Sequence, residues 1–572
     1  MKLTDALVKQ LKISGVTHVF GLQGGAVVHI FDSFERAGIG VTYTHHEESA
    51  ALAAVAHAKI TGQLGCVVVT TGPGSTNAIT GLLAAWQDSI PCIFISGQVR
   101  SNHTSYGRKV RQVGTQEVNI CGIVRPITKY TKFVDNKDNF IDDLKESIRI
   151  TNSDRPGPVW IDIPLEFHWS DIQYNDDLVE DKLNKKNHPV INDEQKIKYL
   201  KLMSESKKPL LILGYGSRLS GALDVLEKFI EKHNIPFVTT WTASDFFPTD
   251  HPLNLGVIGM SGQRGANQAV FNADLLLCYG THLSIPHTTT LFEDYAPNAK
   301  KIIVNIDQDQ LDNLNVKFDL QILSDIKDHI EWLYDQSIAK AEWDKLKTYK
   351  DANWYTTKDS DLPNSNNFIH ELTKSITDKK CLVVDGGGTA LYAGFQSAVM
   401  HKNDRIICSS AISSMGTGLA ETIGVSKSGE FSKYICVIGD GSLMMNIQDL
   451  QTIRQDNINV IICVINNNGY LAIRHTQNEF LEGRLYGTHP DWNLTMPSFE
   501  KIANAFDIEY MKLDQSKDTD KIIDKISTMQ GPVLCEVIVD ENQNVLFKQG
   551  YIDNKDGTFS PQPLSEMTYF KN

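Results

Sequence analysis

The sequence has neither a long apolar run nor a close pair of cysteines, and each absence excludes a class of protein. No stretch approaches the ~18 apolar residues of a membrane-spanning helix. Residues 1–9 alternate apolar and charged side chains, whereas a signal peptide needs a continuous apolar core. The nine cysteines are scattered, with no Cys-x-x-Cys spacing. We therefore expect reduced thiols in the protein core and a cytoplasmic location.

Basic residues are also too few for a nucleic-acid partner. Lys and Arg total 55 against 69 Asp and Glu, which gives a formal net charge of −14. Binding a nucleic-acid backbone needs a basic face. Hydrophobic residues make up 41% and charged residues 22%, which is typical of a soluble globular protein. We therefore predict small-molecule partners, with neither nucleic acid nor membrane among them.

Short β-branched runs alternate with helix-length amphipathic stretches along the chain. Examples of the short runs are residues 66–70, 210–213, 302–304, 435–438 and 460–465. Strands that are apolar on both faces, with helices between them, indicate parallel sheets enclosed by helix layers. The expected fold is therefore α/β, with three doubly wound parallel-sheet domains in tandem.

Two polar stretches divide the chain into segments of normal domain size. Residues 172–195 are rich in Asp, Lys and Asn, and residues 340–367 lack β-branched runs. A tail with scattered Gly and Pro follows, and we expect it to wrap the surface. The predicted division is an N-terminal domain at residues 1–171, a central domain at 190–340, a C-terminal domain at 365–545 and the tail at 546–572.

A carboxylate and an amide follow two successive strand-like runs near the C-terminus. Asp440 follows residues 435–438 within a Gly-Asp-Gly-Ser sequence, and Asn467 follows the next run. The carboxyl ends of parallel strands meet at the ligand-binding edge of a sheet. The side-chain oxygens of Asp440 and Asn467, with the main-chain carbonyl of Gly469, can bind Mg²⁺ there. The amides of Gly441 and Ser442 open the next helix, where a phosphate is favoured.

This pattern resembles the motif of the thiamine-diphosphate enzyme superfamily, which is Gly-Asp-Gly followed some two dozen residues later by Asn-Asn. The resemblance covers nearly the whole chain and is closest to the acetolactate-synthase-like branch. It implies pyrimidine-binding, central and diphosphate-binding domains, and decarboxylation of a 2-oxo acid such as pyruvate with transfer of the two-carbon unit to a carbonyl acceptor. The N-terminal matches occur in the family's order: residues 20–26 (FGLQGGA), 46–50 (HEESA), 71–77 (TGPGSTN), 88–91 (DSIP) and 96–99 (SGQV).

The resemblance assigns roles to particular residues. Glu47 is implied to hydrogen-bond the pyrimidine ring of thiamine diphosphate and so promote proton loss from the reactive carbon. Its neighbour Glu48 is the rival, which we interpret as structural. Met415 is implied to hold the cofactor in a bent shape, although a Met in a glycine-rich turn can equally fill the core. The other implied cofactor contacts are Gly387, Gly388, Thr389, Gly439, Tyr470 and Leu471.

The resemblance also implies an oligomer. In the family the glutamate and the diphosphate site belong to different subunits, so a homodimer or homotetramer with the active site at the subunit interface is implied.

A non-catalytic nucleotide- or flavin-binding protein on the same fold is the alternative from another class. Intact Glu47, Asp440 and Asn467 argue against it, because a decayed site has no reason to keep all three.

The substrate side departs from the family pattern. The resemblance places Gln23, Gly24 and Gln116 near the substrate, but Thr115 and Arg474 replace the usual Phe and Trp. Arg binds carboxylate or phosphate oxygens in a bidentate way. We therefore predict an anionic or larger acceptor, such as the keto-sugar used by similar proteins of surface-polysaccharide pathways. The alternatives are a solvent-facing Arg474 and a true acetolactate synthase of branched-chain amino-acid biosynthesis.

The sequence of the central segment does not decide whether this domain binds a flavin. Residues 214–216, 259–262 and 304–307 fall where acetolactate synthases bind FAD, but His282 stands where the family has Arg. FAD and an empty scaffold domain are both retained as hypotheses. A dehydrogenase is excluded because the Gly-x-Gly-x-x-Gly fingerprint is incomplete after residues 210–213.

Overall fold

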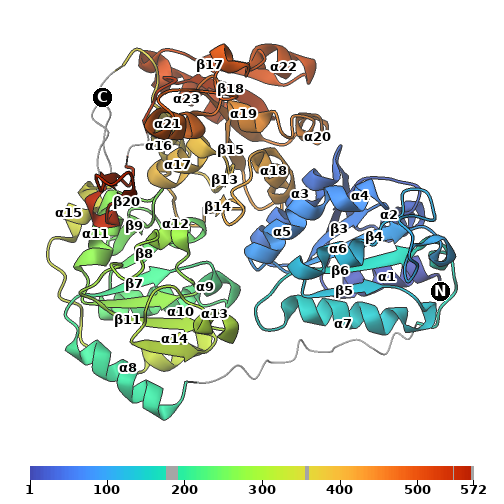
Figure 1. Ribbon diagram of the computed structural model, residues 1–572, viewed down its shortest axis with the longest axis horizontal. Helices are drawn as coiled ribbons and strands as arrows, with labels where there is room; N and C mark the ends of the chain where they lie inside the picture. Colours follow the sequence, from blue (N-terminus) through green and yellow to red (C-terminus); the bar gives the residue numbers. More distant parts are fainter. Residues whose placement is uncertain (175–190, 354–359, 545–546, 568–572) are drawn as a thin grey trace.

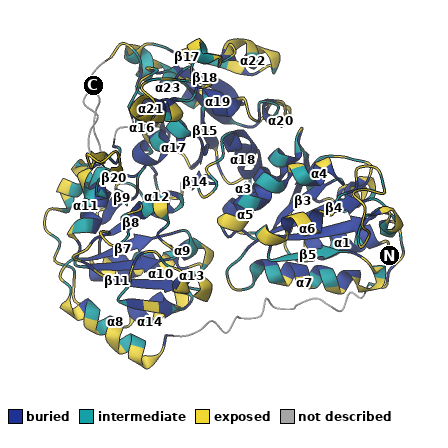
Figure 2. Ribbon diagram, in the orientation of Figure 1, coloured by how far each residue is buried: buried dark blue, intermediate teal, exposed yellow. Residues whose placement is uncertain are grey.

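The computed structural model describes residues 1–174, 191–353, 360–544 and 547–567. Three lobes follow one another along the chain, each built around a six-stranded sheet (Figure 1). All strand pairs within these sheets are parallel, and the inner strands are buried between flanking helices (Figure 2). The prediction of three tandem doubly wound α/β domains is confirmed.

The N-terminal sheet has the order β2-β1-β3-β4-β6-β5. Its direction of winding reverses between β1 and β3, and at such a switch point the carboxyl ends of the strands leave a crevice for a ligand. Its strands are β1 (His18–Gly21), β2 (Gly40–Tyr43), β3 (Gly65–Val69), β4 (Cys92–Gln98), β5 (Tyr130–Phe133) and β6 (Val159–Pro164). Its helices are α1 (Leu3–Ile13), α2 (Val28–Arg36), α3 (Glu47–Thr61), α4 (Pro73–Asn77), α5 (Ile79–Gln87), α6 (Ile120–Val124) and α7 (Phe140–Asn152).

The central sheet has the order β12-β11-β10-β7-β8-β9, which is the strand order of the doubly wound dinucleotide-binding fold. Its strands are β7 (Pro209–Leu213), β8 (Phe237–Thr239), β9 (Asn254–Val257), β10 (Leu275–Tyr279), β11 (Lys300–Asn305) and β12 (Leu320–Leu323). Its helices are α8 (Asp193–Glu205), α9 (Gly216–Leu219), α10 (Leu223–His233), α11 (Arg264–Asn272), α12 (Ile285–Thr288), α13 (Gln308–Asp312), α14 (Ile326–Tyr334) and α15 (Leu346–Asp351).

The C-terminal sheet repeats the topology of the first, with the order β14-β13-β15-β16-β18-β17 and a switch point between β13 and β15. Its strands are β13 (Lys380–Val384), β14 (Arg405–Ile407), β15 (Lys433–Gly439), β16 (Val460–Asn466), β17 (Glu509–Leu513) and β18 (Val533–Ile538). Its helices are α16 (Ser365–Ser375), α17 (Gly388–Ser397), α18 (Thr417–Ser426), α19 (Asp440–Leu443), α20 (Asp449–Gln455), α21 (Leu471–Phe480), α22 (Phe499–Ala505) and α23 (Thr519–Thr528).

The stretches between the domains differ in what they contain. Most of the first expected linker, residues 175–190, lies outside the described residues. In the second, α15 packs against α11 of the central lobe, so part of this stretch is structured. The tail forms a hairpin of β19 (Tyr551–Asp553) and β20 (Phe559–Pro561), then returns to the central lobe, where the Met567 sulfur accepts a hydrogen bond from Asn267.

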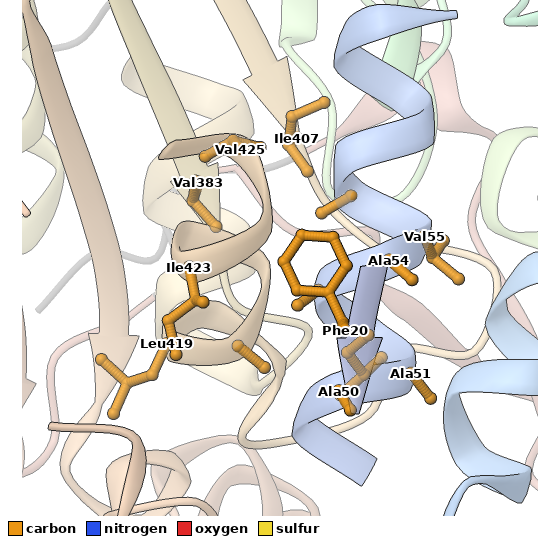
Figure 3. Packing of buried hydrophobic residues seen from close by; sticks show 14 of the residues in the cluster. Phe20, Ala50, Ala51, Ala54, Val55, Val383, Ile407, Leu419, Ile423 and Val425 are labelled. Atoms are coloured by element: carbon orange, nitrogen blue, oxygen red, sulfur yellow. The ribbon is translucent and has the colours of Figure 1, made fainter. Parts of the chain in front are cut away.

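The first and third lobes meet along two helices with small residues, α3 and α18. Figure 3 shows Ala50 and Ala54 of α3 beside Leu419 and Ile423 of α18. Small side chains let the two helix backbones approach closely, and one apolar core therefore runs across both lobes. All nine cysteines are buried and none forms a disulfide, as expected. None of the helices in the described part of the chain has the length and hydrophobicity that a bilayer crossing requires.

Candidate active site

The switch point of the C-terminal sheet collects the residues that the sequence motif predicted. Asp440 follows β15 and Asn467 follows β16, and these two strands pair directly. The main-chain amide of Gly469 donates to one carboxylate oxygen of Asp440 at 2.8 Å, and the amide of Gly441 donates to the other at 2.8 Å. The carboxylate, the turn after β16 and the start of α19 therefore form one unit.

The donor set at this unit suits a divalent cation. Asp440 is 1% exposed, and burial raises its pKa to about 6. Within the described residues its carboxylate makes no ion pair with a basic side chain; it accepts main-chain N–H groups instead. The Asn467 amide nitrogen donates to the Thr389 hydroxyl at 3.2 Å, which fixes the orientation of that amide. Carboxylate, amide and carbonyl oxygens are the ligands Mg²⁺ prefers.

The glycine run after β13 faces the same unit. A Cβ on Gly387 would lie 2.3 Å from the Ser442 hydroxyl and 3.1 Å from Cγ of Met415, so only glycine fits there. Gly388 begins α17, a ten-residue helix that has no side-chain cap at its N-terminus within the described part of the chain. The first amides of a helix have no partner within the helix and can bind an anion. Gly387, Met415 and Ser442 thus converge on the crevice where a diphosphate is expected.

An aromatic and an aliphatic side chain, those of Tyr470 and Leu471, lie on the other side of the turn. The Tyr470 ring lies against Gly441, where an added Cβ would be 2.2 Å from the ring, and Leu471 is 4% exposed at the start of α21. Gly439 has more room, with the nearest atom at 3.8 Å. The close contact makes glycine a requirement at 441 and leaves 439 more tolerant of a small side chain.

One positioning residue of this site was missed from the sequence. Asp385 follows β13 and is fully buried. Its carboxylate accepts from the amide of Gly387 at 2.9 Å and from the amide of Gly418 at 3.1 Å, and burial raises its pKa. Asp385 therefore joins the glycine run to the start of α18. An acidic residue directly after a buried strand and before three glycines was the available signal.

Glu47 lies at the first position of α3 and is 7% exposed. The side-chain amide of Asn77 donates to one carboxylate oxygen at 3.0 Å. The other oxygen faces Gly74, where a Cβ would approach to 3.3 Å. Gly74 and Asn77 of the 71–77 motif therefore both contact the Glu47 carboxylate, which gives a physical reason for these two residues.

The predicted substrate residues of the first lobe surround its switch point. A Cβ on Gly72 would lie 2.0 Å from the main-chain oxygen of Gln116, which itself has φ = +64°. Gly24 packs against Thr70 at the end of β3, with 2.5 Å between an added Cβ and the Thr70 Cβ. The Gln23 side chain hydrogen-bonds Tyr43. Gly24 and Gln116 thus both lie next to the segment that encloses Glu47.

Glu48 points toward the C-terminal lobe of the same chain. Burial raises its pKa, and its carboxyl is hydrogen-bonded to Asn446. The Asn446 amide in turn donates to the main-chain oxygen of Gly416 at 3.0 Å, directly after Met415. Glu48 therefore links the start of α3 to the turn of Met415. It stays a prediction that one active site combines Glu47 of one subunit with Asp440 of another.

Arg474 differs from the expectation of an acceptor-binding cation. It is 2% exposed, and its guanidinium donates to the main-chain oxygens of Asn467 at 2.7 Å, Thr488 at 2.9 Å and Glu541 at 2.8 Å. Because α21 starts directly after the metal-binding turn, the side chain one helical turn on points back at the carbonyls of that turn. The prediction that Arg474 contacts the acceptor, and its solvent-facing alternative, do not match these contacts.

The glycine turn of the central lobe offers no open phosphate site. The amide of Gly214 donates to Tyr279 at 2.9 Å and that of Gly216 to Gly280 at 3.0 Å, so the adjacent strand end already accepts both. Asp307 pairs with Arg155 of the N-terminal lobe at 3.2 Å. The turn therefore does not fit the phosphates of a flavin dinucleotide, because its two glycine amides already donate to the adjacent strand end.

Three domain families match the chain in the order of its lobes. The N-terminal TPP binding domain of thiamine pyrophosphate enzymes matches residues 1–123, the central domain matches 197–333, and the C-terminal TPP binding domain matches 386–537. Together these matches cover well over half of the chain. They include Glu47, Gln116, Met415, Asp440, Asn467 and Arg474, whereas Asp385 lies one residue before the third match.

Curated relatives match over nearly the full length. Acetolactate synthase large subunits of Haemophilus influenzae and Lactococcus lactis are each 30% identical, over 95% of this chain and 95% and 93% of their own. The Escherichia coli isozyme 2 large subunit is 28% identical over 94% of this chain and 96% of its own. The chain therefore belongs to the thiamine pyrophosphate enzyme family, as a thiamine-diphosphate-dependent decarboxylase and carboligase similar to acetolactate synthases.

Proposed function

We propose that this chain uses thiamine diphosphate and Mg²⁺ to decarboxylate pyruvate and joins the two-carbon unit to a second small 2-oxo acid, as an acetolactate synthase does. The observation that carries the proposal is the convergence of Asp440, Asn467 and Gly469 at one switch point, in a chain whose full-length relatives are named acetolactate synthases. Acetolactate synthase was the alternative to a keto-sugar acceptor in the sequence prediction.

The C-terminal lobe would hold the cofactor by its diphosphate. Mg²⁺ would be bound by the side chains of Asp440 and Asn467 and by the carbonyl of Gly469. The open amides at the start of α17, in Gly388 and Thr389, would bind phosphate oxygens. When bound, thiamine diphosphate supplies a nucleophilic carbon and an electron sink for decarboxylation. Met415 and Leu471 would exclude water on the apolar side of the site.

The N-terminal lobe would supply the proton chemistry. Glu47 would hold a proton at a pyrimidine nitrogen of the cofactor, and Asn77 would keep its carboxylate in place for this. Glycine at 74 avoids the close contact that a Cβ would make with the second carboxylate oxygen of Glu47. The family arrangement implies that this lobe serves the cofactor of a second copy, so we propose a homodimer or homotetramer as the active form.

Two residues, Arg474 and Thr115, bear on the choice of acceptor. Arg474 was the main support for an anionic or keto-sugar acceptor, and its guanidinium is used within the protein. Thr115, beside Gln116, is exposed and smaller than the usual Phe, which leaves more room near the predicted substrate residues. The extra room favours a larger acceptor and keeps a keto-sugar as the second candidate. A small 2-oxo acid is the better supported acceptor, because the full-length relatives are named acetolactate synthases.

The test is product analysis with labelled pyruvate, with and without thiamine diphosphate and Mg²⁺, alone and with 2-oxobutyrate or a nucleotide-linked keto-sugar added. We expect labelled acetolactate, only when both cofactors are present. Formation of a sugar adduct without acetolactate would favour the second candidate. Failure to consume pyruvate in any mixture, by folded protein, would contradict the proposed reaction.

A further inference from the structure

A buried arginine fixes the turn that carries the predicted metal ligands. Arg474 is among the largest side chains that are fully enclosed in the protein, and arginine is rarely enclosed without acceptors for its donors. Its guanidinium donates to four main-chain oxygens, those of Asn467 and Asn468 in the turn, of Thr488 and of Glu541. Each acceptor offsets part of the cost of burying the charge.

These four oxygens belong to three separate segments. Asn467 and Asn468 follow β16, Thr488 lies in the loop after α21, and Glu541 follows β18. The guanidinium is a rigid planar group with five N–H donors, so it can hold all three segments in one fixed relation. A lysine ammonium at the end of a flexible stem cannot reproduce this planar arrangement.

The guanidinium also limits the position of Gly469. This residue has φ = +133°, and a Cβ there would lie 2.3 Å from the Thr488 oxygen and 2.9 Å from a guanidinium nitrogen of Arg474. The amide of Gly469 donates to Asp440 on the other side. The turn is therefore held from one side by Arg474 and from the other by Asp440.

A second set of side chains ties the same segments together. The Asn468 amide donates to the Glu541 carboxylate at 2.7 Å, and His489 lies 3.2 Å from the other carboxylate oxygen. One helical turn after Arg474, Gln477 accepts from the Thr488 hydroxyl at 2.6 Å and donates to the Tyr486 oxygen at 3.0 Å. Gln477 thus holds the same loop without contacting the metal-binding turn.

We propose that Arg474 is a positioning residue that sets the Asn467–Gly469 turn for the divalent cation and couples it to the loop at Thr488, and that it does not bind the acceptor. The inference rests on the proposed magnesium site. Removing the guanidinium would take away the donors that hold the carbonyls of the turn. The turn would then move, and the predicted metal ligands would no longer be in position to bind the cation. The effect should be that of losing a group that orients metal ligands, about 10- to 100-fold in metal affinity.

The test measures Mn²⁺ binding by electron paramagnetic resonance, on whole protein with thiamine diphosphate present. We expect Arg474→Met to weaken Mn²⁺ binding about 10- to 100-fold and Arg474→Lys to recover part of this loss. Gln477→Met, the matched control on the same helix, should remain within about threefold of the wild type. Circular dichroism verifies folding, and Arg474→Lys carries the test if Arg474→Met does not fold.

Activity separates positioning from acceptor binding. For Arg474→Met we expect kcat to rise with added Mg²⁺, while the KM for the acceptor at saturating Mg²⁺ stays near that of the wild type. Unchanged Mn²⁺ affinity with a raised acceptor KM would overturn the inference and return Arg474 to the acceptor site. If the wild type itself bound no Mn²⁺, the proposed function would fail; equal binding by wild type and Arg474→Met would refute only the role of Arg474.

Discussion

Gly424 of α18 packs directly on the main-chain oxygen of Ala53 in α3, with only 2.0 Å between that oxygen and the position of a Cβ on residue 424. The His57 ring on the same face of α3 lies within hydrogen-bond distance of the Gly424 oxygen, at 3.3 Å. Two backbones therefore meet where the N-terminal and C-terminal lobes join. The start of α3 carries Glu47 and α18 follows Met415, so this contact sets how the two lobes that carry these residues are arranged within one chain.

Replacing Gly424 with Ala should lower stability, because neither backbone can move aside without opening the shared core. Forcing a methyl group into such a contact costs about 1–3 kcal/mol, which should appear as a lower melting temperature in differential scanning calorimetry. Gly25→Ala is the control, since nothing lies within 4 Å of an added Cβ at residue 25. Equal melting temperatures for both variants would contradict the close packing of α3 on α18.

Replacing Glu47 with Gln should reduce kcat about 10²- to 10⁴-fold, since a group that handles a proton in the reaction is removed. The Asn77 contact can survive with the amide oxygen as acceptor, so the fold should be retained. Pyruvate consumption measures the effect. Glu48→Gln is the neighbouring control and should keep activity within a few-fold of the wild type. A larger loss in Glu48→Gln than in Glu47→Gln would reverse the assignment of the two residues.

Replacing Asp440 with Asn should raise the Mg²⁺ concentration needed for half-maximal activity by at least about tenfold, because the charged ligand of a hard cation is lost. Titration of activity with Mg²⁺ after chelation with EDTA measures this. Asp456→Asn removes a surface carboxylate from the same lobe and should leave the titration unchanged. Identical curves for all three proteins would argue that Asp440 is not a metal ligand.

Most of the fold could be predicted from the sequence, because the buried parallel strands are apolar on both faces. The runs at 435–438 and 460–465 became β15 and β16, and their ends brought Asp440 and Asn467 together. Parallel pairing of successive strands follows from chain connectivity, so the spacing of the motif predicted the geometry of the turn. How the lobes pack could not be predicted, because the residue patterns of α3 and α18 do not indicate which helix each one packs against.

The roles of Arg474 and Asp385 show what sequence spacing cannot provide. Arg474 was predicted to face the acceptor from the identity of the residue it replaces, but its direction depends on the Thr488 and Glu541 carbonyls, which come from distant segments. Asp385 was overlooked because its partners are main-chain amides, which any residue presents. The role of a side chain that binds main-chain groups is hard to predict from a single sequence, because the sequence does not identify its partners.

Replacing Glu421 with Gln should flatten the dependence of stability on pH. Glu421 is fully buried and accepts from the Ser409 hydroxyl at 2.6 Å; burial raises its pKa from 4.5 to about 7. Between these values the folded state keeps the proton that the unfolded chain has lost. Stability from this group is therefore complete below about pH 4.5 and is lost as pH rises through about 7.

Melting temperatures from about pH 5 to pH 8 measure this contribution. The wild type should lose more stability than Glu421→Gln over this window, by up to about 3 kcal/mol from the one carboxyl. The exposed Glu430→Gln variant is the control and should follow the wild type. Parallel curves for the wild type and Glu421→Gln would show that Glu421 does not hold a proton in the folded protein.

The central lobe should bind no flavin, although it has the strand order of a dinucleotide-binding fold. The amides of Gly214 and Gly216 are bonded to the adjacent strand end, and Trp241 fills the boundary with the C-terminal lobe by stacking on Phe395. We expect protein purified from cells to be colourless and a denatured extract to contain no FAD by fluorescence. Added FAD should not raise the melting temperature, since a ligand that binds only the folded state would do so. Stoichiometric FAD in the extract would instead require the glycine turn to open and release its donors.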